Sequence, residues 1–210
     1  DDDCDGLIDD LPLADVSTGA LYGPTTGIAI GDRGKIMLGG DVDGDGTDDL
    51  VALSRGPSSG SSGSYGRAWV VSGADISGAD GVIDSYDSTV IVGASYYYRF
   101  GNLSGPMKDL DDDGTDDLLV NTYYTASSSY QTGYALYFSG ADLTSSMDTG
   151  DYQAYFSLGS GDLSWVSDAG DFDGDGDMDV ILGSPREDTG TGGGYKSNCG
   201  SVALYLGASN

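Results

Sequence analysis

Aspartate recurs at every second position in three short stretches of the chain. The stretches are DVDGDGTDDL from Asp41, DLDDDGTDDL from Asp109 and DFDGDGDMDV from Asp171, and each has Gly at its sixth position. A tight turn at this Gly can direct the oxygens of positions 1, 3, 5, 7 and 9 onto one hard cation. Calcium suits such a loop best, because it accepts several oxygen ligands in flexible geometry, whereas magnesium needs a stricter octahedron. Without a cation, two carboxylates about 4 Å apart would repel by roughly 4 kcal/mol at an effective dielectric near ~20.

Each loop therefore supplies a defined set of candidate calcium ligands. We expect side-chain oxygens from positions 1, 3, 5 and 9 and a backbone carbonyl from position 7. The sets are Asp41, Asp43, Asp45 and Asp49 with the Thr47 carbonyl; Asp109, Asp111, Asp113 and Asp117 with the Thr115 carbonyl; and Asp171, Asp173, Asp175 and Asp179 with the Asp177 carbonyl. The acids out of phase, Asp48, Asp112 and Asp116, are expected to face water. Three matches in register disfavour a merely acidic turn, and the terminal Glu and flanking helices of an EF-hand are missing.

The Asp loops belong to a longer internal repeat. A second marker, in RAWVVSGADI, YALYFSGADL and SVALYLGASN, contains Gly73, Gly140 and Gly207, each 67 residues from the next. These three residues are called the marker glycines below. Three copies of one unit of about 67 residues are therefore expected. We divide the chain into an acidic, Cys-containing segment at 1–15 and repeats at 16–75, 76–142 and 143–210.

Each repeat has the composition of β-strands and turns. An apolar run follows each Asp loop (50–54, 118–124, 180–185), a Gly/Ser/Thr-rich loop comes next, and an alternating run ends at the marker glycine. Further strand candidates are 27–30, 35–40, 88–95 and 152–160. We predict an all-β fold of three four-stranded, propeller-like blades with almost no helix. Three blades do not make a closed propeller by themselves, so closure needs further sequence or other subunits.

The loops resemble the FG-GAP repeats of integrin α-subunits and of bacterial surface proteins. The resemblance rests on GGDVDGDGTDDLVAL, MKDLDDDGTDDLLVN and AGDFDGDGDMDVILGSP. It implies a structural calcium ion in each loop, between the first two strands of a propeller blade. The Phe-Gly and Gly-Ala-Pro signatures of the family are poorly kept, with FG at 100–101 and GSP at 183–185 the nearest matches.

A fourth candidate loop opens the chain. DDDCDGLIDD places Asp1, Asp3, Asp5 and Asp9 in the same phase, with the carbonyl of Leu7 at position 7. The stretch begins 40 residues before Asp41, out of step with the repeat. It resembles Cys-Asp-Gly metal-binding repeats and thrombospondin type 3 repeats, and an acidic linker remains the alternative.

Charge and composition exclude several functions. The formal net charge is -27, with 8 Lys and Arg against 35 Asp and Glu, so we expect cations as partners and no nucleic acid. No apolar run is long enough to cross a bilayer. Histidine is absent, which removes the usual general base and zinc ligand. The clustered acids serve better as calcium ligands than as a glycosidase pair, so we expect no enzyme.

Two non-enzymatic functions remain open. The first is an extracellular, calcium-stabilised structural module that associates with copies of itself into a larger surface assembly or filament. The alternative is an adhesion or carbohydrate-binding domain, with glycans or surface proteins as partners and exposed aromatics as contacts; candidates are Tyr96, Tyr97, Tyr98, Tyr123 and Tyr124. Cys4 and Cys199 could form a disulfide within or between chains in an oxidising compartment, or remain as two thiols. The absence of an initial Met suggests a piece of a longer chain.

Overall fold

The computed structural model describes a large part of the chain in separate ranges. These are residues 20–24, 30–31, 36–54, 65–76, 81–86, 88–93, 100–101, 108–127, 130–158, 165–185, 188 and 199–207. The fourth candidate loop and the three tyrosines at 96–98 lie outside these ranges. So do the side chains of Tyr123 and Tyr124.

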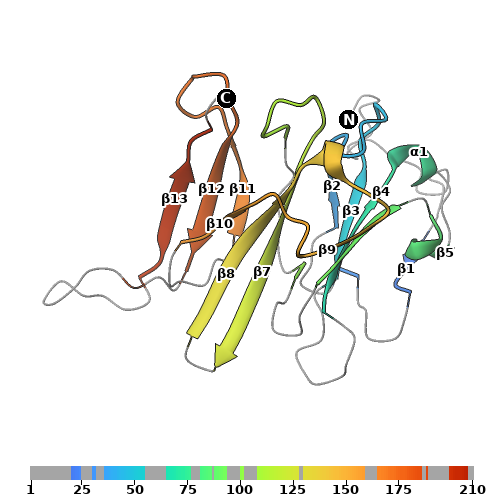
Figure 1. Ribbon diagram of the computed structural model, residues 1–210, viewed down its shortest axis with the longest axis horizontal. Coiled ribbons are helices and arrows are strands. Elements are labelled where there is room, and N and C mark those ends of the chain that lie inside the picture. The colour runs from blue at the N-terminus through green and yellow to red at the C-terminus, as the bar shows by residue number, and fades with distance from the viewer. Residues whose placement is uncertain are drawn as a thin grey trace, which may run out of the picture.

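The described chain consists almost entirely of short strands, as predicted (Figure 1). They are β1 (Leu21–Tyr22), β2 (Ile36–Leu38), β3 (Leu50–Ser54), β4 (Arg67–Val71), β5 (Gly81–Val82), β6 (Ser88–Val92), β7 (Leu118–Ser127), β8 (Tyr130–Phe138), β9 (Ser146–Asp148), β10 (Ala154–Phe156), β11 (Trp165–Gly170), β12 (Asp179–Ser184) and β13 (Ser201–Tyr205). Three single turns of helix interrupt them: α1 (Gly73–Ile76), η1 (Ile83–Ser85) and η2 (Gly140–Asp142). The apolar runs predicted after each Asp loop form β3, β7 and β12, and the alternating runs before the marker glycines form β4, β8 and β13.

The strands form three main sheets, none of which closes on itself. The first sheet has the order β2-β3-β4-β6-β9, the second β10-β8-β7 and the third β11-β12-β13, while β1 and β5 form a small parallel pair. The run β2-β3-β4-β6 is antiparallel throughout, but β6 lies within the predicted second repeat and β9 adds a fifth strand to this sheet. The second and third sheets have three strands each within the described residues, so the all-β fold is compatible with propeller-like blades, but none of the sheets has the predicted four strands.

Strand β9 crosses between sheets. It follows β8 in the chain but pairs in parallel with β6 of the first sheet, and the chain then returns to pair β10 with β8. The first sheet therefore runs to Val92 and includes Ser146–Asp148, so sheet membership does not follow the predicted repeat boundaries. This excursion ties the first and second sheets together.

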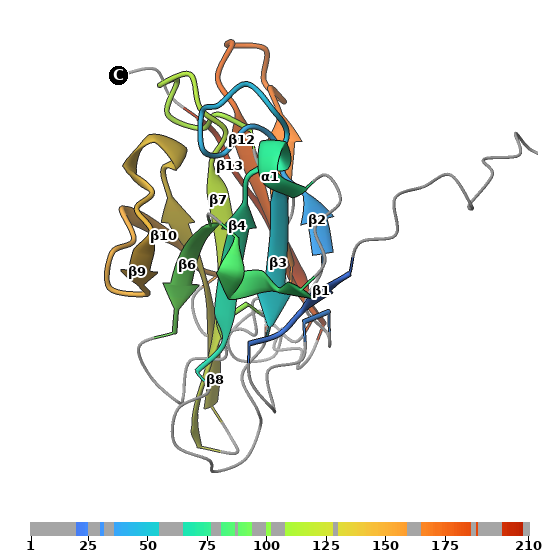
Figure 2. The ribbon, with the colours of Figure 1, turned by 90° about the vertical axis from the view of Figure 1, so that its right-hand side faces the viewer.

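The core lies between neighbouring sheets, which stack face to face (Figures 1 and 2). Alternate residues of a strand point to opposite faces, so each central strand contributes to two layers of core. In the first sheet Val51 and Leu53 of β3 pack towards the second sheet, while Ala52 faces a separate cluster around Trp69 and Ile83. The second and third sheets meet through a cluster that includes Leu119, Tyr137, Val166, Val180 and Leu182.

One face of the third sheet has no such cover among the described residues. Ile181 follows Asp179 by two positions, as Val51 follows Asp49, so the two residues occupy equivalent faces of their sheets. In the first sheet this face packs against the second sheet. Its cross-strand neighbour Leu204 is 36% exposed, and Val202 on the same face is 72% exposed. Trp165, which lies opposite Gly183, is 51% exposed. A row of apolar side chains thus faces outward at one end of the stack.

Candidate metal centres

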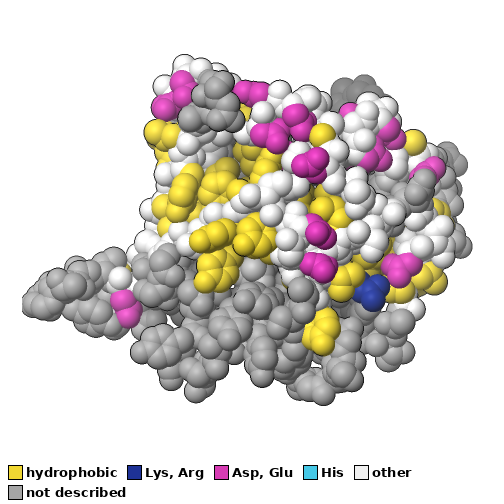
Figure 3. Space-filling view, viewed as in Figure 1, with side chains coloured by type: hydrophobic (Ala, Val, Ile, Leu, Met, Phe, Trp, Pro, Cys, Tyr) yellow, Lys and Arg dark blue, Asp and Glu magenta, His cyan; other side chains and the backbone are white. Residues whose placement is uncertain are grey.

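The three Asp loops emerge at the same end of the three stacked sheets. In Figure 1 they are the loops at the top of the view, and the acidic side chains gather along this edge in Figure 3. Each loop directly precedes one strand of its sheet: β3 in the first, β7 in the second and β12 in the third. The Gly at position six has a φ of +89° in Gly46, +97° in Gly114 and +102° in Gly176, which is the left-handed conformation that the predicted turn requires.

Each loop brings three carboxylates together. One oxygen of each member lies within 4.8 Å of the others in the groups Asp41, Asp43 and Asp45; Asp109, Asp111 and Asp117; and Asp171, Asp173 and Asp179. These nine residues were all predicted as ligands. The predicted ligands Asp49, Asp113 and Asp175 lie in the same loops but outside the groups. All candidate ligand atoms in these groups are carboxylate oxygens, which hard divalent cations prefer, so the loops fit a metal ion.

The Asp at position nine is buried and is held by backbone amides. Asp49 is fully buried, and its Oδ2 accepts hydrogen bonds from the amides of Val42 at 2.8 Å and Asp43 at 3.0 Å. Its Oδ1 accepts from the amide of Gly73 at 3.1 Å. A carboxylate that accepts several amide hydrogen bonds fixes the backbone around it. This residue therefore organises the loop, besides any ligand role.

The same bond recurs at the other two marker glycines. Gly140 donates to Asp117 Oδ1 at 3.0 Å, and Gly207 donates to Asp179 Oδ1 at 2.8 Å. A Cβ atom placed on Gly73 would lie 2.1 Å from the Asp48 carbonyl oxygen. The equivalent distances are 2.3 Å at Gly140 and 2.6 Å at Gly207. Gly is thus required because the loop passes directly against the end of the neighbouring strand.

The Asp at position five is bound locally and across the unit. Asp45 accepts from the Thr47 amide at 2.8 Å and from the Ser72 hydroxyl at 2.7 Å. Asp113 accepts from the Ser139 hydroxyl at 3.0 Å and from the Thr115 hydroxyl and amide. In the third unit the residue before the marker glycine is Leu206, which has no hydroxyl. The carbonyl ligands at Thr47, Thr115 and Asp177 remain predictions. The hydrogen bonds of these residues within the loops involve their amides instead of their carbonyls.

The second loop has an additional donor. The Tyr137 hydroxyl lies 2.8 Å from Asp111 Oδ2 and 3.1 Å from Asp117 Oδ2. Burial raises the pKa of Asp117 to about 6, and the nearby Asp111 charge adds to this shift. Burial likewise raises the pKa of Asp49, whereas the Ser72 hydrogen bond lowers that of Asp45. A buried carboxylate with a raised pKa gains from a nearby cation, which stabilises its charged form.

One out-of-phase acid does not behave as predicted. Asp48 and Asp112 are exposed, as expected. Asp116 is half-buried instead, because its amide donates to the Asp41 carbonyl at 3.0 Å and its side chain lies against Gly40 of the first unit. It also lies 3.6 Å from the Lys108 ammonium. Asp116 therefore contributes to the contact between the first and second loops.

Sequence reasoning missed the serines, the tyrosine and the role of the marker glycines. The signal for two of them was present, since Ser72 and Ser139 each stand directly before a marker glycine. Tyr137 had no such signal, because Val70 and Leu204 take its place in the other units. Cys199 is exposed, two residues before β13, and Cys4 lies outside the described residues, so the disulfide stays a prediction.

Comparison with protein families identifies the third unit. Residues 165–197 match the FG-GAP repeat, a range that contains β11, the third Asp loop and β12. The match agrees with the resemblance noted for the third loop. A search of curated proteins found no match. Among the described residues, no helix has the length and apolar character needed to span a membrane.

Proposed function

Starting from the FG-GAP repeat at residues 165–197, we propose that this protein is an extracellular, non-enzymatic structural module stabilised by calcium, with one ion in each Asp loop. The main support is the threefold recurrence of one arrangement. Each loop clusters three carboxylates within 4.8 Å, and in each the ninth Asp receives the amide of a marker glycine. A structural role follows from this second feature, because the loop and the strand that ends at the glycine are joined at the metal site.

Calcium would offset the repulsion that each loop stores. Calcium near ~1 mM, at sites with a Kd of about 10 μM, would add about 2.7 kcal/mol of stability per site. Three sites would add about 8 kcal/mol, which is comparable to the whole stability of an ordinary domain. The metal-free protein is therefore expected to be much less stable than the calcium-loaded protein, and a calcium-rich compartment outside the cell suits such a protein.

The absence of catalysis is part of the proposal. In the loops, the ninth Asp side chain is already engaged by amides and the others surround a cation position. A carboxylate pair acting on a sugar needs one acid with a raised pKa facing an apolar pocket. Asp117 has the raised pKa, but its two oxygens face the Leu110 amide, the Gly140 amide and the Tyr137 hydroxyl rather than open space.

We assign self-association to the open face of the third sheet. Its exposed members are Trp165, Val202 and Leu204, together with Ile181 between them. The corresponding face of the first sheet is covered by the second sheet, and the opposite end of the stack is already covered by the cluster around Ile83. A second copy meeting the first through the same face would bury these residues on both partners.

Two measurements test the proposal separately. Thermal unfolding in calcium and in excess EDTA should differ by tens of degrees, and an unchanged melting temperature would refute calcium stabilisation. Sedimentation in calcium should show a dimer or larger species that Val202→Asp converts to monomer. Ile36→Asp is the matched control, because Ile36 is 60% exposed on a different sheet. A monomeric parent protein would contradict self-association and leave the calcium sites standing.

A further inference from the structure

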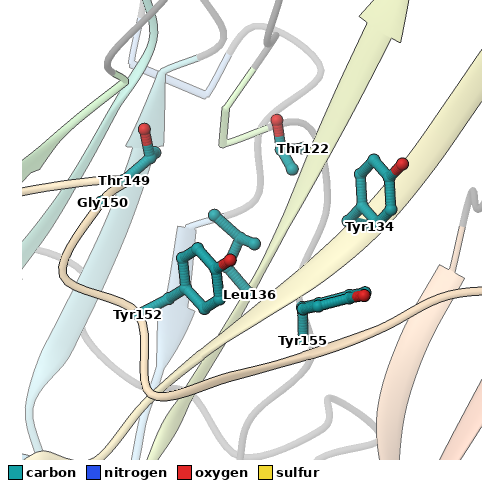
Figure 4. A pocket seen from close by; sticks show the side chains of 7 residues that line it. All are labelled: Thr122, Tyr134, Leu136, Thr149, Gly150, Tyr152 and Tyr155. Atoms are coloured by element: carbon teal, nitrogen blue, oxygen red, sulfur yellow. The ribbon is translucent and has the colours of Figure 1, made fainter.

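A pocket opens at the outer end of the core between the first and second sheets. Its volume is about 420 Å³, and its described lining consists of Thr122, Tyr134, Leu136, Thr149, Gly150, Tyr152 and Tyr155 (Figure 4). Tyr134 and Leu136 extend from β8, while Tyr155 comes from β10 beside it. The pocket lies apart from the three metal loops, and neither the family match nor the calcium sites account for it.

Three tyrosines form the aromatic part of the wall. The Tyr155 ring lies edge to face with the Tyr134 ring, at 5.6 Å between centroids, and with the Tyr152 ring, at 6.0 Å. In Figure 4 the Tyr134 side chain lies above Tyr155, and the Tyr152 ring lies to their left, next to Leu136. Tyr155 is 56% exposed and Tyr152 39% exposed, so ring surface is open to a ligand. Figure 3 shows apolar side chains gathered on this face, below the acidic edge.

The hydroxyls of these tyrosines differ from those of Tyr137 and Tyr205, which are bonded to the protein. Tyr137 donates to the second loop, and Tyr205 donates to the Ser157 carbonyl at 2.8 Å. Within the described part of the chain, no hydrogen bond joins the hydroxyl of Tyr134, Tyr152 or Tyr155 to the protein. Tyrosine hydroxyls that have apolar surroundings usually find a partner. The three phenols therefore present both an apolar face and an unused polar group to the pocket.

The other wall is held in place by the excursion through β9. The Thr149 amide donates to the Val92 carbonyl at 3.0 Å, which fixes the turn to the first sheet. Asp148 Oδ1 accepts from the Gly150 amide at 2.5 Å, and the Gln153 amide donates to the Tyr137 carbonyl at 2.9 Å on the second sheet. Both ends of the turn are thus anchored, and the pocket is preformed.

We propose that this pocket binds a neutral carbohydrate residue. Sugar rings offer C–H surfaces that pack on aromatic faces and hydroxyls that exchange hydrogen bonds with phenols. The described lining has no Asp, Glu, Lys or Arg, which favours an uncharged ligand. The volume falls in the range of about 300–1,000 Å³ that is typical of small-molecule sites, large enough for a sugar unit. This site differs from the tyrosines suggested by sequence alone and adds a binding activity to the structural role.

The test is a screen of the calcium-loaded protein on an array of neutral glycans, followed by titration of the best glycan and its component monosaccharides by NMR. Binding should weaken at least tenfold in Tyr155→Ala and by a smaller factor in Tyr155→Phe, which keeps the ring. Tyr22→Ala is the matched control, because Tyr22 is 59% exposed and does not line the pocket. Its affinity should equal that of the parent protein.

Three results would overturn the carbohydrate site. The first is an array without a bound glycan, and the second is binding that Tyr155→Ala and Tyr152→Ala leave unchanged. The third is a saturable shift of the tyrosine NMR signals on titration with tetramethylammonium ion, with no shift on titration with any neutral sugar. That result would identify an aromatic site for cations. A melting curve of each variant in calcium checks its folding, so loss of the calcium-stabilised fold and loss of sugar binding are distinguished.

Discussion

The Asp117 side chain and the Gly140 amide, 23 residues apart in the chain, are joined by a hydrogen bond of 3.0 Å. Asp49 with Gly73 and Asp179 with Gly207 form the same bond. Each bond connects the last Asp of an Asp loop to the marker glycine that lies just after β4, β8 or β13. The 67-residue spacing of the marker glycines therefore reflects a hydrogen bond that recurs once in each unit.

Replacing Asp117 with Asn should destabilise the protein by about 2–4 kcal/mol, because an amide nitrogen must then face a donor in place of one carboxylate oxygen. The affected donors are the Leu110 amide, at 2.6 Å, and the Gly140 amide. Urea unfolding measures the loss. Asp48→Asn is the control and should change stability by less than about 0.5 kcal/mol, since Asp48 is exposed.

The same pair of variants separates two roles of Asp117. Its amide hydrogen bonds do not need a metal, so the destabilisation should persist when unfolding is measured in excess chelator. If Asp117→Asn and the parent protein are equally stable without calcium, Asp117 acts only as a ligand and its hydrogen bond to Gly140 carries no stability of its own.

Replacing Gly140 with Ala should cost about 1–3 kcal/mol through crowding. The new Cβ atom would lie 2.3 Å from the Asp116 carbonyl oxygen and 2.7 Å from that of Val42. Gly183→Ala is the matched change, because its nearest neighbour is the Trp165 Cβ at 3.4 Å. Thermal unfolding of both variants in calcium gives the comparison, and equal melting temperatures would argue against the close approach.

Replacing Asp112 with Gly should stabilise the second loop by up to about 1 kcal/mol. Asp112 has a φ of +59°, whereas the first and third loops have Gly44 and Gly174 at this position. Relief of the left-handed conformation is worth about 1–2 kcal/mol and outweighs the added freedom of Gly in the unfolded chain. The reverse change, Gly174→Asp, should destabilise by a similar amount. Chemical unfolding at constant calcium measures the free energy of unfolding of both variants. If both substitutions raised it, or both lowered it, the argument would be contradicted.

Terbium should report on the second loop in particular. Tyr137 lies 2.8 Å from Asp111, so ultraviolet excitation of its phenol should sensitise the emission of a Tb³⁺ ion bound there. Tyr137→Phe should remove most of this emission, and Asp111→Asn should weaken terbium binding at the same loop. Asp43→Asn, which changes the first loop, should leave the sensitised signal nearly intact. Emission that responds to Asp43 but not to Asp111 would place the sensitised ion elsewhere.

The sequence predicted many of the strands and the clustering of carboxylates in each Asp loop, because both depend on local patterns. Alternation and apolar runs mark β3, β7 and β12, and every member of the three carboxylate groups is an in-phase acid. The phase did not indicate that Asp49, Asp113 and Asp175 lie outside these groups. The path of β9 was not predictable, since a three-residue strand has no usable period and its pairing with β6 depends on how two sheets approach.

The missed residues of the site depend on contacts over long separations. Nothing local indicates that Asp49 accepts the amide of Gly73, or that Asp116 turns away from water towards Gly40. The tyrosine pocket was missed for the same reason. Tyr134 and Tyr155 come from β8 and β10, which the excursion through β9 separates in the chain, and the register of these two strands places the rings side by side.

Strand β9 also determines which parts of the molecule should unfold together. Because Ser146–Asp148 forms an edge strand of the first sheet while the flanking strands β8 and β10 belong to the second, we expect unfolding of one sheet to destabilise the other. The third sheet has no strand exchanged with a neighbour among the described residues. Hydrogen exchange should therefore find one cooperative block formed by the first two sheets and a separate, weaker block formed by β11, β12 and β13.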